Sequence, residues 1–351
     1  MSAALQRAAI QGAVVLAPAN LFYLTGWRPH AYERTIALLL EASGREALLV
    51  PTLEAEHAKT TGVAEILAVA DGENPWQLVA QWLHASGLRV LGVEKHLFTL
   101  ANWEALQARL SQVVAADVTP LITTLRRSKE AAEVARIQEA ARIADQGIAA
   151  GIAALKPGVT ERFIAHVIEV AMIDAGAEGP SFATTVLFGP DAALPHGETG
   201  ERVAQAGDAV VLDIGALYKG YASDITRTVF VGEADALQRQ VYETVRAAQQ
   251  AGRAALRAGI SGEHVDRIAR QVIVQAGFGE AFTHRLGHGL GIDIHEPPYL
   301  VAGNADPLQA GDVVTVEPGI YLPGRFGVRI EDDFLVTETG AQVLTQAPYW
   351  H

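Results

Sequence analysis

Apolar and polar positions follow a short-period pattern in the first third of the chain. Up to about residue 122, compact apolar runs alternate with amphipathic stretches. Asn74 and Thr99 stand at the N-cap positions of two stretches that predict helices, at 74–87 and 99–110. The apolar runs predict strands at 13–18, 35–42, 46–51, 65–70, 89–94 and 112–118. Strands that alternate with helices are typical of a small α/β domain with a partly parallel sheet.

From residue 128 onward, the apolar positions recur every three or four residues. This helical period predicts a long helix of about seven turns, which Ser128 caps and the Lys-Pro-Gly sequence at 156–158 ends. A second helix is predicted to follow Thr160 and to end at Gly176. Further helices are predicted at about 234–258 and 262–276. Because the remaining sequence is strand-like, this part is expected to be α+β, with helices outside a curved sheet.

Length and composition favour two globular domains. The 351 residues exceed the ~100–200 that are typical of one domain, and we place the predicted domains at 1–124 and 125–351. Apolar residues make up 50% and charged residues 19%, which is typical of a globular rather than a disordered chain. The net charge of −13 argues against nucleic acid and anionic membranes as main partners, because their phosphates would be repelled.

The chain contains no cysteine. Disulfides, thiolate nucleophiles and iron–sulfur clusters are therefore excluded, and any metal must be bound by oxygen and imidazole. No apolar run approaches the ~18 residues that a spanning helix needs. Gln11, Pro18 and Asn20 interrupt the N-terminal apolar stretch, which we interpret as a buried strand rather than a signal peptide. We therefore expect a soluble, cytoplasmic protein.

An internal repeat lies in the second part of the chain. The segments GDAVVLDIG (207–215) and GDVVTVEPG (311–319) share the pattern Gly-Asp-x-Val-x-x-acid-x-Gly. The repeat places Asp213 at the position of Glu317. Each copy continues through a turn into a second strand, so each copy predicts a β-hairpin.

The second arm of each predicted hairpin carries another acid, Asp224 in the first copy and Glu331 in the second. Paired strands hold opposite residues about 4.5–5.5 Å apart, so the two acids of a hairpin can converge on one face. Two facing hairpins would bring four carboxylates together, which requires cations because desolvated like charges repel. The alternative for each acid is a solvated position at a strand edge.

Histidines lie between and before the two hairpins. The glycine-rich segment HRLGHGLGIDIHEPP (284–298) contains His284, His288 and His295. Three histidines among twelve residues, between two carboxylate hairpins, predict at least one metal ligand. A loop upstream contains His196, which by itself would be interpreted as an exposed loop residue.

These motifs resemble the pita-bread metallopeptidases, specifically their prolidase and aminopeptidase P branch. The resemblance covers essentially the whole chain, and its most specific part is the ordered set LDIG, SDITRT, GHGLGIDIHEPP, EPGIY and GVRIED. It implies a creatinase-type N-terminal domain and a pita-bread catalytic domain with a pseudo-twofold repeat. By position, it implies five ligands for two divalent ions, with Asp224 and Glu331 bridging both: Asp213, Asp224, His288, Glu317 and Glu331.

The resemblance also implies roles beside the metal ligands. Glu317 is expected to accept the proton of the attacking water. His196 and His295 are expected to contact the substrate and to stabilise the developing oxyanion. Arg329 is expected to contact the substrate or the ligands.

The residue that binds the substrate carboxylate departs from the family pattern. Many microbial prolidases have an arginine after the second histidine of the motif, whereas this chain has Tyr299. Tyr299 itself is a candidate for contact with the substrate, and Arg28 and Arg34, in the loop 26–35, are candidates to replace the arginine, from the same or a partner subunit.

The activity that the resemblance implies is hydrolysis of the Xaa-Pro peptide bond by a dinuclear metal exopeptidase, a dipeptidase (prolidase) in the first place. An aminopeptidase P that acts on longer peptides is the main alternative, and a methionine aminopeptidase lacks the extra domain. A creatinase-like amidinohydrolase and a non-catalytic pita-bread binding module are the alternatives from other classes. One imidazole and four carboxylates favour Mn²⁺ or Co²⁺ over Zn²⁺. The resemblance implies a proline-containing di- or oligopeptide substrate and a homodimer.

Overall fold

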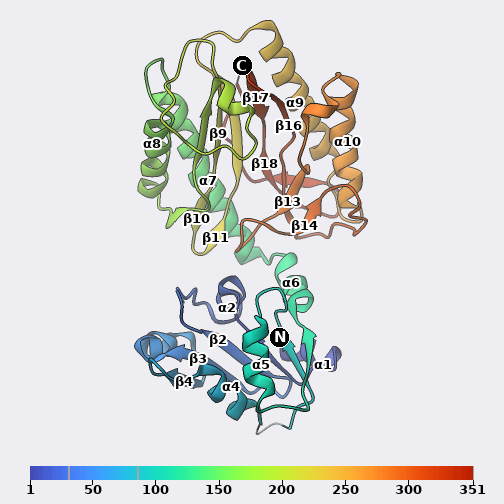
Figure 1. The fold of residues 1–351 in the computed structure, drawn as a ribbon. Helices are drawn as coiled ribbons and strands as arrows, with labels where there is room; N and C mark the ends of the chain where they lie inside the picture. Colours follow the sequence, from blue (N-terminus) through green and yellow to red (C-terminus); the bar gives the residue numbers. More distant parts are fainter. Residues whose placement is uncertain (31, 85–86, 351) are drawn as a thin grey trace. The chain divides into compact units, whose positions relative to one another are not determined.

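The computed structural model of the protein describes residues 1–30, 32–84 and 87–350. The chain divides into two compact units, Met1–Arg126 and Arg127–His351 (Figure 1). In the described part of the chain, no helix has both the length and the apolar character needed to cross a membrane.

The first unit is built on one mixed sheet. Within residues 1–30, 32–84 and 87–126, six strands follow the order β4-β3-β2-β1-β5-β6. β2 pairs antiparallel with β1 and β3, whereas β3–β4, β1–β5 and β5–β6 are parallel, so the sheet is partly parallel as predicted. The strands are β1 (Gly12–Val15), β2 (Ala37–Glu41), β3 (Glu46–Pro51), β4 (Glu65–Val69), β5 (Val90–Val93) and β6 (Val114–Asp117).

Short helices accompany this sheet. They are α1 (Ser2–Arg7), α2 (Pro18–Thr25), α3 (Ala55–Ala58), α4 (Pro75–His84), α5 (Leu100–Gln107) and α6 (Thr119–Arg127), with 3₁₀ turns η1 (Thr52–Glu54) and η2 (Lys59–Thr61). α4 and α5 correspond to the two predicted helices, and residues 85–86 of the prediction lie outside the described residues. The hydroxyl of Thr99 caps α5 by accepting a hydrogen bond from the Asn102 N–H, at 3.2 Å.

The predicted strand at 13–18 is wrong in its second half. β1 ends at Val15, and Pro18 begins helix α2, because the fixed φ of proline suits the first helical position. The fully buried carboxylate of Glu94 accepts hydrogen bonds from the N–H groups of Leu16 and Ala17, which orders the chain before α2. The N-terminal stretch therefore contains a buried strand between two helices.

The second unit surrounds several small sheets with long helices. Within residues 127–350, the helices are α7 (Ala131–Ala154), α8 (Glu161–Asp174), α9 (Ala236–Ala255) and α10 (Gly262–Gln275), with η3 (Gly189–Ala193) and η4 (Gly279–Ala281). α7 and α8 pack together on one side of the strands, and α9 and α10 pack together on the other (Figure 1). The predicted α+β class with outer helices is confirmed.

The predicted cap of the long helix is wrong. α7 begins after Glu130, whose carboxylate caps the helix in a reciprocal pair with Glu133. Ser128 instead donates a hydrogen bond from its hydroxyl to the Ala310 carbonyl, at 3.0 Å. The helix predicted after Thr160 is confirmed as α8, and the Thr160 hydroxyl caps it by accepting a hydrogen bond from the Phe163 N–H.

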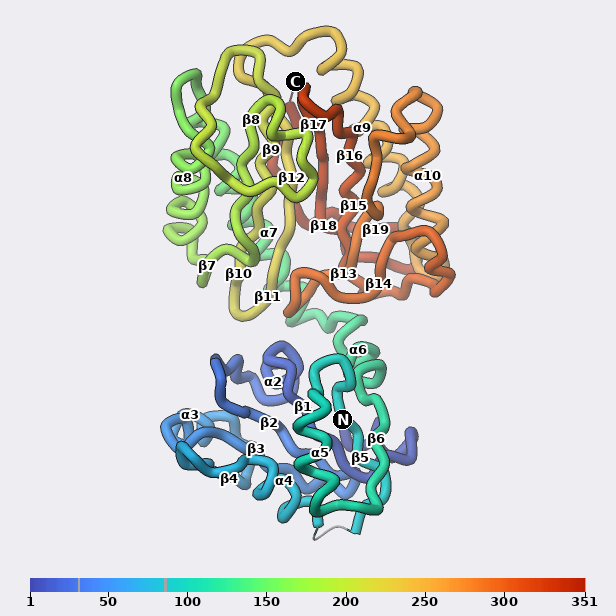
Figure 2. The backbone as a smooth tube through the Cα atoms, viewed as in Figure 1, coloured from blue at the N-terminus to red at the C-terminus, as the bar shows by residue number. Residues whose placement is uncertain are grey.

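The strands of the second unit form two similar hairpin systems (Figure 2). The first half contains β7 (Gly179–Pro180), β8 (Thr185–Phe188), β9 (Ala209–Ile214), β10 (Ala216–Tyr218), β11 (Tyr221–Ala222) and β12 (Ile225–Phe230). The second half contains β13 (Gly287–Gly289), β14 (Glu296–Leu300), β15 (Val313–Val316), β16 (Gly319–Leu322), β17 (Phe326–Arg329), β18 (Asp332–Val336) and β19 (Ala341–Val343). β12-β9-β8 and β14-β13-β15-β18-β19 are the main sheets.

The internal repeat places the acids at equivalent ends of these hairpins. β9 and β12 are antiparallel and pair Ile214 with Ile225, and β15 and β18 are antiparallel as well. Asp213 lies on β9 and Asp224 directly precedes β12. In the second hairpin Glu317 directly follows β15 and Glu331 directly precedes β18.

Candidate metal centre

The acids and histidines singled out in the sequence line one cavity of about 610 Å³ in the second unit. Its walls include eight predicted site residues: His196, Asp213, Asp224, His288, His295, Glu317, Arg329 and Glu331. His196 and His295 are exposed, whereas Asp224, His288 and Glu331 are buried. The two hairpins, β13 and the loop after η3 therefore bring residues that are up to 135 positions apart, His196 and Glu331, to one cavity.

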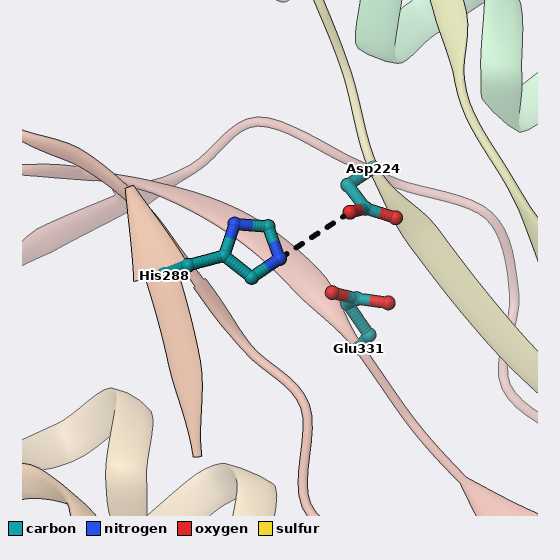
Figure 3. Close-up of side chains that lie close together, drawn as sticks. All are labelled: Asp224, His288 and Glu331. Atoms are coloured by element: carbon teal, nitrogen blue, oxygen red, sulfur yellow. Dashed lines mark ion pairs between the residues drawn. The ribbon is translucent and has the colours of Figure 1, made fainter. Parts of the chain in front are cut away.

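Asp224, His288 and Glu331 form the tightest group in this cavity. One ligand atom from each lies within 4.8 Å of the others, and Figure 3 shows the imidazole edge facing both carboxylates. The His288 Nε2 atom lies 3.6 Å from Asp224 Oδ2 and 3.5 Å from Glu317 Oε1. Three side chains with donor atoms this close have the composition of a metal site with hard oxygen ligands and one imidazole.

The imidazole of His288 is held as a neutral ligand. Its Nδ1 lies 3.1 Å from the Gly289 carbonyl oxygen, which only accepts, so Nδ1 carries the proton and Nε2 presents its lone pair. Its backbone N–H donates to Thr315 Oγ1, at 3.1 Å. Burial, and then the neighbouring His295, lower the pKa of His288 to about 3. The histidine therefore offers no positive charge to balance the carboxylates.

The carboxylates repel one another in the absence of such a charge. Burial, followed by the repulsion of Glu331 and Asp213, raises the pKa of Asp224 well above its ordinary value. Burial and the charges of Glu317 and Asp213 do the same for the pKa of Glu331. Burial raises the pKa of Glu317 to about 8, although Arg329 opposes the shift. A cation would restore the ionised forms.

The unpaired oxygen atoms show where a cation fits. In the part of the chain that the structure describes, Asp213 Oδ1, Asp224 Oδ1 and Glu331 Oε1 are buried and have no hydrogen-bond partner. The second oxygen of Glu331 accepts a bond from Thr226 Oγ1 at 2.7 Å, and that of Asp213 accepts one from Arg329 Nη2 at 2.5 Å. These two carboxylates are thus oriented by one oxygen and keep the other for a metal.

Comparisons with known proteins identify the family of the chain. The model of "Metallopeptidase family M24" matches residues 135–338, and that of the "Creatinase/Prolidase N-terminal domain" matches residues 1–128. The chain belongs to metallopeptidase family M24. The sequence-based prediction of a pita-bread metallopeptidase is thereby confirmed.

Relatives match this M24 metallopeptidase along nearly its whole length. An uncharacterized peptidase of Staphylococcus aureus (strain bovine RF122 / ET3-1) is 40% identical over 332 residues, 94% of this chain and 93% of that protein. The solved Xaa-Pro dipeptidase from Bacillus anthracis has a TM-score of 0.91 at 35% identity, covering 99% and 96% of the two chains. The X-Pro aminopeptidase from Thermotoga maritima has a TM-score of 0.88 at 29% identity, covering 99% and 100%.

Two residues of the M24 site were not assigned from the sequence. His284 lines the cavity, where its Nε2 accepts a hydrogen bond from the Tyr321 hydroxyl at 2.8 Å. Tyr321 in turn accepts one from Arg329 Nη1, at 2.9 Å. Tyr321 pairs with Gly327 across the hairpin of β16 and β17, two positions from Arg329, so both point to one face. The alternation of side chains between the two faces of a strand is the feature of the sequence that could have placed Tyr321 beside Arg329.

Three predicted residues are not among the residues that line the cavity. Tyr299, on β14, is not among the lining residues, and its ring lies below the guanidinium of Arg285, with Cζ 4.8 Å from the ring centroid. Arg34 belongs to the first unit and forms a two-pronged pair with Asp71, at 3.0 and 3.2 Å. Arg28 also belongs to the first unit, with its Cζ 5.5 Å from the centroid of the Phe22 ring.

Glycine at position 287 is required beside the histidine ligand. A Cβ atom there would lie 2.1 Å from the Thr315 carbonyl oxygen, so Gly287→Ala must displace β13 and with it His288. We expect a loss of about 1–3 kcal/mol of unfolding free energy and a loss of roughly tenfold or more in metal affinity. Calorimetric titration with Mn²⁺ and denaturant unfolding measure the two.

The matched control for this substitution is Gly179→Ala, because a Cβ atom at Gly179 meets nothing within 4 Å. The control is expected to change both quantities by less than the error of measurement. Unchanged metal affinity in Gly287→Ala would contradict the placement of His288.

Proposed function

We propose that this M24 metallopeptidase is an Xaa-Pro dipeptidase that uses two divalent metal ions in its second domain, residues 125–351. The observation that carries the proposal is the set of buried carboxylates with unpaired oxygens around the unprotonated Nε2 of His288. The proposed ligands are Asp213, Asp224, His288, Glu317 and Glu331. The likeness to the solved Xaa-Pro dipeptidase supports the choice of substrate.

When bound, the divalent ions make water nucleophilic at neutral pH and polarise the scissile carbonyl. Glu317, which lines the cavity and would be ionised beside the cations, accepts the proton of the attacking water and passes it to the leaving prolyl nitrogen. His196 and His295 line the same cavity and stabilise the charge that develops on the carbonyl oxygen. Arg329 holds Asp213 in place through its 2.5 Å hydrogen bond.

Other parts of the proposal rest on the sequence. Occupancy by Mn²⁺ or Co²⁺ follows from a donor set of one imidazole and four carboxylates, with Zn²⁺ as the alternative. A homodimer follows from the family resemblance, and the cytoplasm is the proposed location. The presence of all five ligand residues argues against a creatinase-like amidinohydrolase and a non-catalytic binding module.

A peptide-length series tests the proposal. With Mn²⁺, the wild-type protein is expected to cleave Ala-Pro with a kcat/KM at least roughly tenfold higher than Ala-Pro-Ala, because binding contacts to a terminal group are lost in the longer peptide. Glu317→Ala is expected to lower kcat for Ala-Pro by about 10²–10⁴-fold, since the proton acceptor is removed. Product release measured by chromatography gives both values.

The same series decides against the proposal if the result is reversed. Cleavage of Ala-Pro-Ala without cleavage of Ala-Pro would identify an aminopeptidase P, in line with the likeness to the X-Pro aminopeptidase from Thermotoga maritima. Full activity of Glu317→Ala would contradict the proposed proton transfer.

A further inference from the structure

Among the described residues, two arginines line the metal cavity, and they differ in their partners. Arg329 is buried and donates hydrogen bonds to Asp213, Thr226 and Tyr321, so its guanidinium is already engaged. Arg285 is half-buried, and within residues 1–30, 32–84 and 87–350 it has neither an ion pair nor a hydrogen-bond partner for its side chain. The cavity therefore contains a cationic group that this part of the protein leaves uncommitted.

The guanidinium of Arg285 is nevertheless fixed in position. It lies over the aromatic ring of Tyr299, with Cζ 4.8 Å from the ring centroid, at the distance of a cation–π contact. The adjoining backbones are joined, because the Leu286 N–H donates to the Leu300 carbonyl and His288 pairs with Tyr299 across β13 and β14. When the face of a guanidinium packs on an aromatic ring, the N–H groups at its edge stay available to bind a planar anion.

The free carboxylate of a dipeptide adds a negative charge beyond those that the proposed divalent ions balance, which favours a cationic partner in the cavity. The metal ligands contribute Asp213, Asp224, Glu317 and Glu331, and a dipeptide adds the free carboxylate of its C-terminal proline. Placing that carboxylate in the cavity without a partner would be costly. Arginine binds carboxylates through two parallel charge-assisted hydrogen bonds.

We infer that Arg285, supported by the ring of Tyr299, binds the free carboxylate of the substrate, an inference that rests on the proposed dipeptidase function. Tyr299 acts through Arg285 and is a positioning residue. Because the prolyl carboxylate is free in a dipeptide and amidated in a longer peptide, Arg285 favours dipeptides. The arginine that the sequence motif lacks after HEPP is thus replaced from the neighbouring strand region, within the same domain.

One competing candidate in the first unit, Arg34, is already engaged. Both carboxylate oxygens of Asp71 occupy the N–H fork of Arg34, at 3.0 and 3.2 Å, and Glu33 accepts a further bond from its Nη1. A second carboxylate would have to displace these partners. Arg285 has no such partner to lose within the described part of the chain.

The test compares substrates and ligands that differ only in the carboxylate. For the Mn²⁺-loaded protein, Arg285→Gln is expected to raise KM for Ala-Pro by about 10- to 100-fold, because a charge-assisted hydrogen-bond pair is lost. Its kcat is expected to change by less than about threefold and its KM for Ala-Pro-amide to stay at the wild-type value. Tyr299→Leu is expected to raise KM for Ala-Pro by a smaller factor, and Arg285→Lys to restore it in part.

A binding measurement gives a readout independent of hydrolysis. Calorimetry is expected to show that wild-type protein binds L-proline at least roughly tenfold more tightly than L-prolinamide, and that Arg285→Gln removes this difference while Mn²⁺ affinity is unchanged. The matched control is Arg239→Gln, which removes another arginine stacked on an aromatic ring, with Cζ 5.3 Å from the Trp350 centroid and outside the cavity lining. The control is expected to keep the preference for proline.

Each outcome decides between the two proposals. A wild-type KM for Ala-Pro in Arg285→Gln, or a raised KM in Arg28→Ala or Arg34→Ala alone, would overturn the role of Arg285 and leave the dipeptidase function intact. Failure of the wild-type protein to cleave Ala-Pro would overturn the dipeptidase function. In that case a preference for proline over prolinamide that depends on Arg285 would still support the anion site, and its absence would overturn it.

Discussion

Replacing Glu331 with glutamine is expected to lower peptide hydrolysis on the order of a thousandfold or more while stabilising the metal-free protein. The glutamine keeps the shape of the side chain but replaces an ionisable carboxyl group at a position proposed to hold the metals. Activity falls because the metals lose an anionic ligand. Metal-free stability rises because the pKa of Glu331 is raised in the folded state, so that at neutral pH folding must either bury its charge beside Asp224, Asp213 and Glu317 or take up a proton, and glutamine avoids both costs.

The opposite signs of these two effects make the experiment decisive. Denaturant unfolding with a chelator and with Mn²⁺ measures the stability of wild type and variant in both states. Wild type is expected to gain much more from Mn²⁺ than Glu331→Gln, because a ligand that binds only the folded state stabilises it. Glu139→Gln, at the exposed ion pair with Arg142 on α7, is the control and is expected to be nearly neutral. If the metal-free Glu331→Gln variant is less stable than the metal-free wild type, the buried carboxylates do not destabilise the metal-free site.

Replacing Arg227 with methionine is expected to cost about 3–5 kcal/mol of unfolding free energy, because it leaves a buried charge unpaired. The guanidinium of Arg227 is 1% exposed and lies 2.7 Å from Asp332 Oδ1. It also donates hydrogen bonds to the carbonyl oxygens of Glu331, at 2.6 Å, and of Ala347, at 3.0 and 2.8 Å. Urea unfolding of the metal-free protein measures the loss.

The exposed pair of Arg142 and Glu139 again provides the control for this substitution. Their side chains are 49% and 37% exposed, so Arg142→Met is expected to cost less than about 1 kcal/mol. A loss for Arg227→Met no larger than that of the control would contradict a structural role for the buried pair. Because Arg227 holds the carbonyl of Glu331, a lowered Mn²⁺ affinity is expected to accompany the loss of stability.

The sequence predicted the structure best where residues recur in a regular pattern. The repeated pattern around Asp213 and Glu317 predicted two hairpins because each glycine, acid and apolar position recurs in order. The structure places both acids, with Asp224 and Glu331, on the walls of one cavity. The long helix was predicted for the same reason, since a stripe of apolar residues every three or four positions needs no knowledge of its neighbours.

What the sequence could not supply depends on contacts between distant segments. Ser128 is a residue type that often caps helices, but Glu130 caps α7. The Ser128 hydroxyl instead donates a hydrogen bond to the carbonyl of Ala310, which lies 182 residues away in sequence. The sequence assigns no role to His284, because its partner Tyr321 is identified only by the pairing of β16 with β17. The contact of Arg285 with Tyr299 likewise emerges only once β13 and β14 are paired.

The donor atoms proposed for the metals are divided between the two halves of the second unit. One half supplies Asp213 and Asp224, and the other supplies His288, Glu317 and Glu331. Hydrogen bonds that cross between the halves include those from the Glu331 N–H to the Thr226 carbonyl and from the Thr226 hydroxyl to Glu331. A cation held by both sets of donors is a cross-link between the halves, so its release and the parting of the hairpins become one coupled event.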